Sequence, residues 1–128
     1  MPRFQANFHL YAENLDRAIS FYSNHFNFKL LGHIENEGNK PWAALKIENA
    51  ILWLGNQGTK SGLIILIDSE IEVFASNLVE NDVEFFVPDE FKDKLHDGQI
   101  VLQTDWGKHA WLFDSERNRI MLFQPSEQ

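Results

Sequence analysis

The chain has 128 residues, of which 44% are hydrophobic and none is cysteine. This length allows one domain with a substantial core, and the lack of cysteine excludes disulfides, thiolate nucleophiles and cysteine-based metal sites. Eleven basic and nineteen acidic residues give a net charge of −8, and no basic patch is present. This balance argues against nucleic acid as a partner, whereas an acidic protein tends to attract cations.

The N-terminal sequence, MPRFQANF, lacks the basic and apolar regions of a secretion signal, so we predict a cytoplasmic protein. No later segment reaches the roughly 20 apolar residues that a membrane-spanning helix needs, so we expect no membrane partner. From Phe4 to Tyr11, apolar and polar residues alternate. This period of two predicts a half-buried strand.

A helix is predicted after this strand. Asn14 is a residue type that caps helix N-termini, and an apolar stripe with helical spacing follows it. The stripe consists of Leu15, Ala18, Ile19 and Tyr22. Strands are then predicted at residues 28–34, 42–47 and 50–54, the last two as a hairpin.

A glycine-rich segment, GNQGTKSG, at about residues 55–62, separates a first module of about residues 1–56 from a second of about residues 62–125. The second module opens with a continuous apolar run, Leu63 to Ile67, which is typical of a strand covered on both faces. Ser69 is then predicted to cap a second helix. The stripe of that helix consists of Ile71, Phe74, Ala75 and Leu78.

The rest of the second module is predicted to be mostly strands. A strand at residues 83–87 precedes PDEFKDKLHDG, a polar loop or short helix, and a short strand at residues 100–103. The segment KHAWLFDSERNRIMLFQ then reads as a hairpin, because two apolar runs flank a cluster of turn-forming residues. One face of this hairpin is aliphatic, and the other mixes His109, Trp111 and Phe113 with Arg119 and Met121.

The two modules repeat in register. Adding 56 to the positions of the first helical stripe gives the positions of the second. Each module is therefore a strand–helix–strand–strand–strand unit, and two such units are too few for a solenoid. The predicted fold is α+β, with two pseudo-symmetric βαβββ modules whose curved mixed sheets form a cleft.

Two stretches carry a resemblance to a known family. HLYAENLDRAISFYSNHFNFKLL and LFDSERNRIMLFQ are similar to the first helix and the closing hairpin of the vicinal oxygen chelate superfamily, which includes glyoxalase I, fosfomycin-resistance proteins, extradiol dioxygenases and bleomycin-resistance proteins. Ser115, Glu116 and Arg117 replace the usual Pro-Asp-Gly of that hairpin. The resemblance covers nearly the whole chain and implies the same two-module fold.

The metal-dependent members of this superfamily bind the ion through His, Gln or Glu side chains. The corresponding positions here hold Asn7, Trp53 and Met121, and the strand GLIILI offers no ligand. Neither Trp nor Met binds a hard divalent cation, and Asn is a weak ligand. We therefore expect no metal and no other cofactor, and regard an enzymatic role as the less favoured interpretation.

Two alternatives stay open. His9, His33 and His109 lie in predicted strands and could form a displaced metal site, which would make the protein a metal-dependent glyoxalase, dioxygenase or thiol-transferase-type enzyme. In the other alternative, the cleft is filled by its own side chains and the fold serves as an interaction module.

The favoured hypothesis is a metal-free, bleomycin-resistance-like protein. Bleomycin-resistance proteins are acidic dimers that sequester a cationic antibiotic between subunits, and they carry a Trp-Gly similar to Trp106-Gly107. The resemblance implies a homodimer whose small-molecule ligand is cationic or aromatic, stacked on Trp53, Trp106 and Trp111. The other predicted ligand-binding residues are Asn7, His9, His109, Arg119 and Met121.

Overall fold

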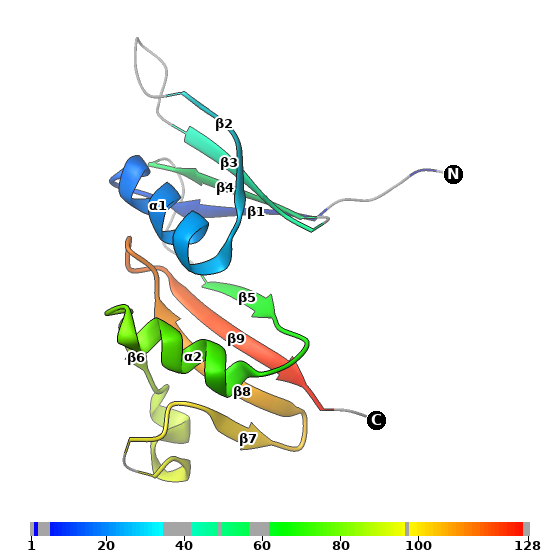
Figure 1. Ribbon diagram of the computed structural model, residues 1–128, viewed down its shortest axis with the longest axis vertical. Helices are drawn as coiled ribbons and strands as arrows, with labels where there is room; N and C mark the ends of the chain where they lie inside the picture. The colour runs from blue at the N-terminus through cyan, green and yellow to red at the C-terminus, as the bar shows by residue number, and fades with distance from the viewer. Residues whose placement is uncertain are drawn as a thin grey trace. The chain divides into compact units, whose positions relative to one another are not determined.

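The computed structural model describes residues 2, 6–34, 42–48, 50–56, 62–96 and 98–126. The chain divides into two compact units: unit 1 comprises Met1–Ser61 with Ser115–Asn118, and unit 2 comprises Gly62–Asp114 with Arg119–Gln128. Each unit combines one α-helix with a curved mixed sheet, so the predicted α+β fold class is confirmed (Figure 1). No helix in the described part of the chain is long and apolar enough to cross a membrane.

Unit 1 contains a four-stranded sheet and one helix. In chain order its elements are β1 (Ala6–Tyr11), α1 (Leu15–Phe26), β2 (Lys29–Ile34), β3 (Trp42–Ile47) and β4 (Ala50–Gly55). The strand order is β1-β4-β3-β2, with β1 parallel to β4 and the other neighbours antiparallel. The predicted hairpin of β3 and β4 is confirmed.

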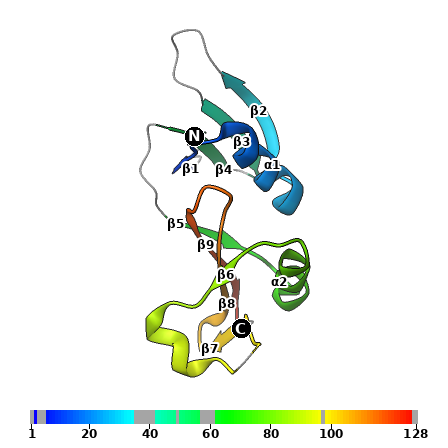
Figure 2. The same ribbon diagram turned by 90° about the vertical axis from the view of Figure 1, so that its left-hand side faces the viewer.

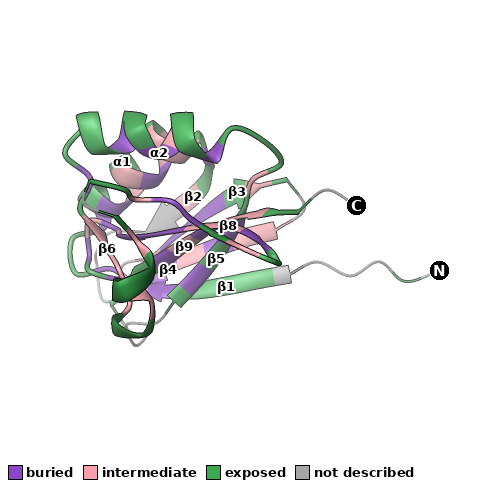
Figure 3. Cartoon of the chain, turned by 90° about the horizontal axis from the view of Figure 1, so that it is seen from below, coloured by how far each residue is buried: buried purple, intermediate pink, exposed green. Residues whose placement is uncertain are grey.

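Helix α1 begins where the sequence predicts. The Asn14 side-chain oxygen accepts a hydrogen bond from the Arg17 backbone N–H at 3.0 Å, which satisfies one of the donors left unpaired at a helix start. The helix surface that faces the strands is buried, whereas the opposite surface is exposed (Figure 3). The buried residues of α1 are Leu15, Ala18 and Tyr22.

Unit 2 contains a five-stranded sheet, an α-helix and a 3₁₀ helix. Its elements are β5 (Gly62–Leu66), α2 (Ile71–Glu80), β6 (Phe85–Phe86), the 3₁₀ helix η1 (Asp89–Lys94), β7 (Leu102–Thr104), β8 (Gly107–Phe113) and β9 (Arg119–Pro125). The strand order is β5-β9-β8-β6, and β7 also pairs with β8. Figure 2 shows α2 and the yellow-green segment of η1 on opposite sides of these strands. β5 and β9 are parallel, and the closing hairpin of β8 and β9 is antiparallel as predicted.

The start of helix α2 differs from the prediction that Ser69 caps it. The cap position is held by Glu70, whose φ of 61° is left-handed and whose side chain makes no capping hydrogen bond. The Ser69 hydroxyl instead donates to Asp68 at 3.3 Å. The Ile71 N–H donates to the side-chain oxygen of Gln124 at 3.0 Å, so a residue 53 positions away supplies the missing acceptor.

The prediction that β5 is covered on both faces is wrong. Leu63 and Ile65 are buried, whereas Ile64 and Leu66 are 58% and 68% exposed. β5 lies at the edge of the sheet, and its side chains alternate between the face with α2 and the opposite face. The aliphatic face of the closing hairpin is buried as predicted, with Ala110, Leu112, Ile120 and Leu122 each 0% exposed.

Gly107 marks a close approach between two backbone segments of unit 2. Its φ is 150°, which L-residues with a side chain rarely adopt. A Cβ atom at this position would lie 2.2 Å from the backbone oxygen of Gln124. The glycine of the Trp106-Gly107 pair therefore has a structural explanation, because no larger residue fits where β8 begins beside β9.

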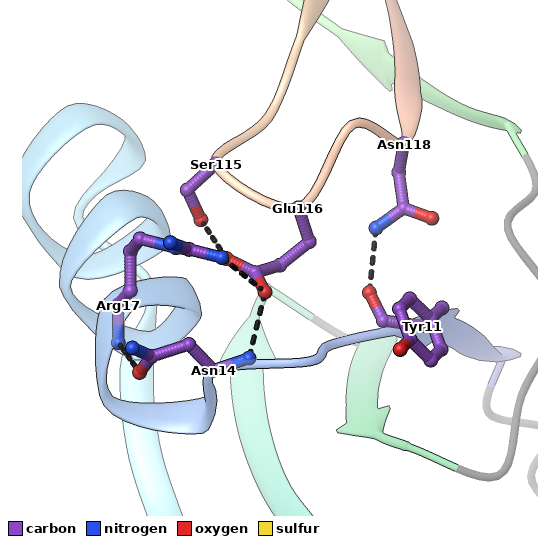
Figure 4. Close-up of polar contacts among 6 residues, drawn as sticks. All are labelled: Tyr11, Asn14, Arg17, Ser115, Glu116 and Asn118. Atoms are coloured by element: carbon purple, nitrogen blue, oxygen red, sulfur yellow. Dashed lines mark hydrogen bonds and ion pairs between the residues drawn. The ribbon is translucent and has the colours of Figure 1, made fainter.

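The turn between β8 and β9 groups with unit 1, although both strands belong to unit 2. Glu116 is its central residue, and its side chain is 0% exposed. The Glu116 carboxylate accepts hydrogen bonds from the Asn14 N–H at 2.8 Å and from the Arg17 Nε and Nη2 at 2.7 and 3.1 Å (Figure 4). One carboxylate thus holds both the backbone and a side chain at the start of α1.

The charge of Glu116 is maintained by these contacts. Burial alone would raise the pKa of the Glu116 carboxyl, but hydrogen bonds from Arg17, Asn14 and Ser115 and the Arg17 charge outweigh it and lower the pKa below 4.5. In the same turn, the buried Asn118 amide donates to the Tyr11 carbonyl oxygen at 2.8 Å. Glu116 and Asn118 are therefore buried polar residues, although the composition of the turn suggests exposed ones.

Candidate functional site

The strongest candidate site lies on the face of the unit 2 sheet opposite α2. Strand register aligns four side chains in one row across β5, β9, β8 and β6, because paired residues share a face. The row consists of Ile64, Met121, Trp111 and Phe86. Two aromatic rings, one thioether and one aliphatic side chain therefore form a continuous apolar strip.

The next row along the sheet contains Gly62, Arg119 and Phe113. Gly62 has no side chain, and a Cβ atom there would meet only the Arg119 backbone oxygen at 3.5 Å, so space remains beside Arg119. Apart from Phe113, the residues of these two rows line an open groove with a volume of about 490 Å³. Its lining comprises Gly62, Leu63, Ile64, Phe86, Pro88, Glu90, Trp111, Arg119, Ile120 and Met121.

Trp111 contributes only a small exposed surface to this groove, because it is 8% exposed. Its ring is nearly parallel to that of Phe91 in η1, with centroids 5.3 Å apart, and to that of His109, with centroids 5.7 Å apart. These contacts fix the orientation of the indole. Trp111 was expected to stack on a ligand, but here its ring already stacks on Phe91 and His109 of the protein.

His109 supports this row from the adjacent position on β8. Its Nε2 lies 2.9 Å from the Thr104 hydroxyl, which also donates to the Gly107 carbonyl oxygen at 3.2 Å. This network assigns the hydrogen to Nε2 and leaves Nδ1 buried without a hydrogen-bond partner in the described part of the chain. Burial lowers the pKa of His109 below 6.5, so its ring is neutral at physiological pH.

Two charged side chains border the apolar row. The guanidinium carbon of Arg119 lies 5.7 Å from the centroid of the Phe86 ring, a cation–π geometry. Glu90, the second residue of η1, lines the groove from a different element. Both side chains are exposed, so both charges are available to a solute that enters the groove.

Three of the predicted site residues lie in unit 1, on one face of its sheet. The Trp53 indole N–H donates to the Asn7 side-chain oxygen at 3.1 Å, and the Trp53 ring lies 5.5 Å from that of Trp42. His9 is exposed and pairs with Trp53 in the register of β1 and β4. Asn7, His9 and Trp53 are therefore brought together with one another. His33 lies in β2, and its side chain is outside the described part of the structure.

Trp106 does not line the groove. It lies in the turn between β7 and β8 and is 80% exposed. Its predicted role in stacking on the ligand stays a prediction.

Of the remaining predictions, Trp111, Arg119 and Met121 line the groove, and His109 packs against Trp111. Sequence reasoning missed Ile64, Phe86 and Glu90. Ile64 alternates with the buried Leu63 and Ile65, but the uninterrupted apolar run concealed that period. Phe86 could not be placed because its position depends on the pairing of β6 with β8. Glu90 could not be placed because it lies in η1, where Phe91 packs on the distant Trp111.

The donors at the positions corresponding to the superfamily's metal ligands do not fit a hard divalent ion. The Asn7 amide oxygen already accepts the Trp53 N–H, and Met121 offers a soft thioether within an apolar row. Among the described residues, no three His, Asp or Glu side chains are grouped so that they could hold a metal ion.

Comparison with known proteins identifies related folds. A family model described as the Glyoxalase/Bleomycin resistance protein/Dioxygenase superfamily matches residues 5–122. No curated protein matches the sequence.

Solved structures share the fold over nearly their full length. An antibiotic binding protein, TnmS3 from Streptomyces sp. CB03234, is 22% identical, with a TM-score of 0.73 over 98% of both chains. Lactoylglutathione lyase from Agrobacterium tumefaciens is 12% identical, with a TM-score of 0.74 over 96% of this chain and 94% of that one. The fosfomycin resistance protein FosX from Listeria monocytogenes is 14% identical, with a TM-score of 0.69 over 98% and 96%. At these identities the likeness establishes the fold.

Proposed function

The chain belongs to the glyoxalase/bleomycin resistance protein/dioxygenase superfamily, and we propose that within it this protein binds a small aromatic molecule without transforming it. The observation that carries the proposal is the apolar row of Ile64, Met121, Trp111 and Phe86 along an open groove. In this function the protein sequesters its ligand, and antibiotics are one class of compound that it would bind.

The size and chemistry of the groove support this function. Small-molecule sites usually have volumes of roughly 300 to 1,000 Å³ and are mainly apolar with a few polar groups. The groove has about 490 Å³, and its ionisable lining residues are Glu90 and Arg119. Aromatic and thioether side chains adapt well to flat ligands, which favours an aromatic body in contact with Phe86 and Met121.

The side chains of the groove favour binding over catalysis. Met121 has no proton to transfer and is a poor ligand for a hard cation. His109, which packs against Trp111, is poorly placed for acid–base chemistry, because its Nε2 is bonded to Thr104 and its Nδ1 is buried. The net charge of −8 favours a ligand with a cationic group.

The predicted homodimer is part of this proposal. A second copy would enclose a ligand that an open groove leaves partly in water, and enclosure strengthens binding by removing more apolar surface from water. Sedimentation velocity with and without ligand tests it: a monomer under both conditions would limit the function to the single chain. The cytoplasmic location stays a prediction.

Binding is tested by titrating a panel of flat aromatic compounds, including bleomycin-type and other cationic ones, while recording amide chemical shifts. We expect saturable shifts centred on Ile64 and Met121. In Ile64→Gln, the loss of an apolar contact should weaken binding about threefold to tenfold. Because Ile64 is 58% exposed, this variant should keep its fold.

The matched control is Leu31→Gln, which changes a 53% exposed apolar residue of unit 1 and should leave the affinity unchanged. The same samples, purified without chelators, are assayed for bound metal and for turnover of a glyoxalase-type substrate. Stoichiometric metal that is lost in His9→Ala or His109→Ala, together with turnover, would replace this proposal by the metal-dependent enzyme.

A further inference from the structure

We infer that the groove of unit 2 selects an amphoteric aromatic compound, which presents an anionic group to Arg119 and a cationic group to Glu90. This inference rests on the proposed function, because it specifies the charges of the molecule that the groove would bind. It also extends the expectation of a cationic ligand by adding an anionic group.

The first observation is the pair of opposite charges in the lining of one groove. Arg119 and Glu90 are its two ionisable lining residues. They come from different elements, since Arg119 begins β9 and Glu90 belongs to η1. A ligand that lies along the groove would therefore meet a positive and a negative side chain.

The second observation is that neither charge is neutralised within the described part of the chain. No carboxylate there lies within ion-pair distance of Arg119, whose guanidinium instead lies over the Phe86 ring. Lys92 is close in sequence to Glu90, but its ammonium pairs with Asp89 at 2.7 Å. By contrast, the cations Arg17 and Lys108 are each paired with a carboxylate.

Arg119 keeps its full capacity to bind an anion. A guanidinium uses its face for a cation–π contact and the N–H groups in its plane for a carboxylate, so the contact with Phe86 leaves these donors available. Gly62, its neighbour in register, adds no side chain that would block the approach. An anionic group of a ligand can therefore reach the N–H groups.

The overall charge favours a ligand that carries both groups. A purely anionic ligand approaches a protein of net charge −8, which repels it. A purely cationic ligand is attracted over long range but brings its charge into the groove that holds Arg119. An amphoteric ligand satisfies both side chains, and its aromatic body contacts Phe86 and Met121.

The test uses four compounds built on one naphthalene ring. One carries an aminomethyl group and a carboxylate at opposite ends, two carry one of these groups each, and the fourth carries an uncharged hydroxymethyl group. Calorimetric titration should give the amphoteric compound an affinity about twofold to fivefold higher than either singly charged compound, as expected for partly exposed ion pairs.

Two variants test which side chain of the groove binds each charged group of the ligand. Arg119→Gln should abolish the advantage of the amphoteric compound over the cation, and Glu90→Gln should abolish its advantage over the anion. Lys46→Gln and Glu80→Gln, which change exposed residues outside the groove, are the matched controls and should preserve both differences. Amide shifts at Ile64 and Met121 report whether each compound occupies the groove.

The outcomes separate this inference from the proposed function. Groove binding with equal affinity for all four compounds, or tightest binding of the cation with further tightening in Arg119→Gln, would overturn the inference and leave the proposed function intact. If none of the four compounds shifts the groove resonances, the inference is overturned. If the panel of flat aromatic compounds also fails to shift them, the proposed function is overturned as well.

Discussion

Unit 1 and unit 2 each bury one sheet face under a helix, but their opposite faces differ. In unit 1 that face holds a hydrogen bond between Trp53 and Asn7, and Trp42 lies beside the indole. In unit 2 the corresponding face carries an apolar row that contains Ile64 and Met121 and lines a groove. The face that packs on the helix must be apolar for the unit to fold, whereas the opposite face is free to diverge.

The two units also differ in how their helices and strands are held. Unit 1 depends on polar contacts of a buried carboxylate, Glu116, with the start of α1. Unit 2 depends on a close backbone approach at Gly107 and on the Gln124 side chain at the start of α2. Four predictions test this contrast.

The largest effect is expected in unit 2 from Gly107→Ala. A Cβ atom 2.2 Å from the Gln124 oxygen forces β8 and β9 apart, and the φ of 150° is unfavourable for alanine. We expect a loss of about 3 kcal/mol or more in the free energy of unfolding, measured by urea denaturation. Trp106→Ala is the adjacent control. Because Trp106 is 80% exposed, it should change this free energy by less than about 0.5 kcal/mol.

The next effect is expected in unit 1 from Glu116→Ala. It removes the acceptor of the Asn14 N–H and of the Arg17 guanidinium, so we expect a loss of about 2–3 kcal/mol in the free energy of unfolding. Because Arg17 is half exposed, water replaces part of its contact.

The control for Glu116 is Glu13→Ala, an exposed carboxylate whose removal should cost less than about 0.5 kcal/mol. The pH dependence provides a second test. Because folding lowers the pKa of Glu116 below 4.5, its contribution is complete above that value and is lost as the pH falls through the folded-state pKa. Equal acid sensitivity in wild type and Glu116→Gln would contradict this role.

A smaller effect distinguishes Gln124 from Ser69 as the residue that stabilises the start of α2. Gln124→Ala removes the acceptor of the Ile71 N–H and should cost about 1 kcal/mol by urea denaturation. Ser69→Ala should cost less than about 0.5 kcal/mol, because the Ser69 hydroxyl bonds to Asp68 and not to the helix. A larger loss for Ser69→Ala than for Gln124→Ala would show that Ser69 caps the helix.

The smallest effect is a change in how steeply the melting temperature depends on pH. Burial lowers the pKa of His109 and of His25 below 6.5, so the unfolded chain binds protons first as the pH falls. The contribution of each neutral ring is complete above pH 6.5 and decreases below it. Between about pH 7 and pH 5, the melting temperature should therefore fall less steeply in His109→Gln and in His25→Gln than in the wild type. Unchanged slopes in both would contradict this.

The elements that could be predicted from the sequence are those whose signals are local. Asn14 and the helical stripe after it locate α1, and strict alternation gives the two faces of the closing hairpin. The superfamily was also predicted, because its motifs lie in these two segments, and the family model confirms it.

The features that were missed depend on contacts between distant segments. Ser69 is a good cap by composition, but Gln124 bonds the helix start instead, and no local pattern contains that pairing. The exposure of Ile64 follows from the edge position of β5, which only the strand order reveals. Glu116 resembles any polar turn residue until Arg17 and Asn14 are placed beside it.

The turn at Ser115–Asn118 has a consequence for synthesis on the ribosome. Residues Met1–Ser61 emerge first, yet unit 1 also needs Glu116, which follows Asn14 by 102 positions. Unit 1 therefore cannot be completed until residues 62–118 have also been translated, although N-terminal domains usually fold first. A nascent chain stalled before the closing turn would present the start of α1 without its carboxylate acceptor. Unit 1 is thus completed by four residues that are translated only after residues 62–114 of unit 2.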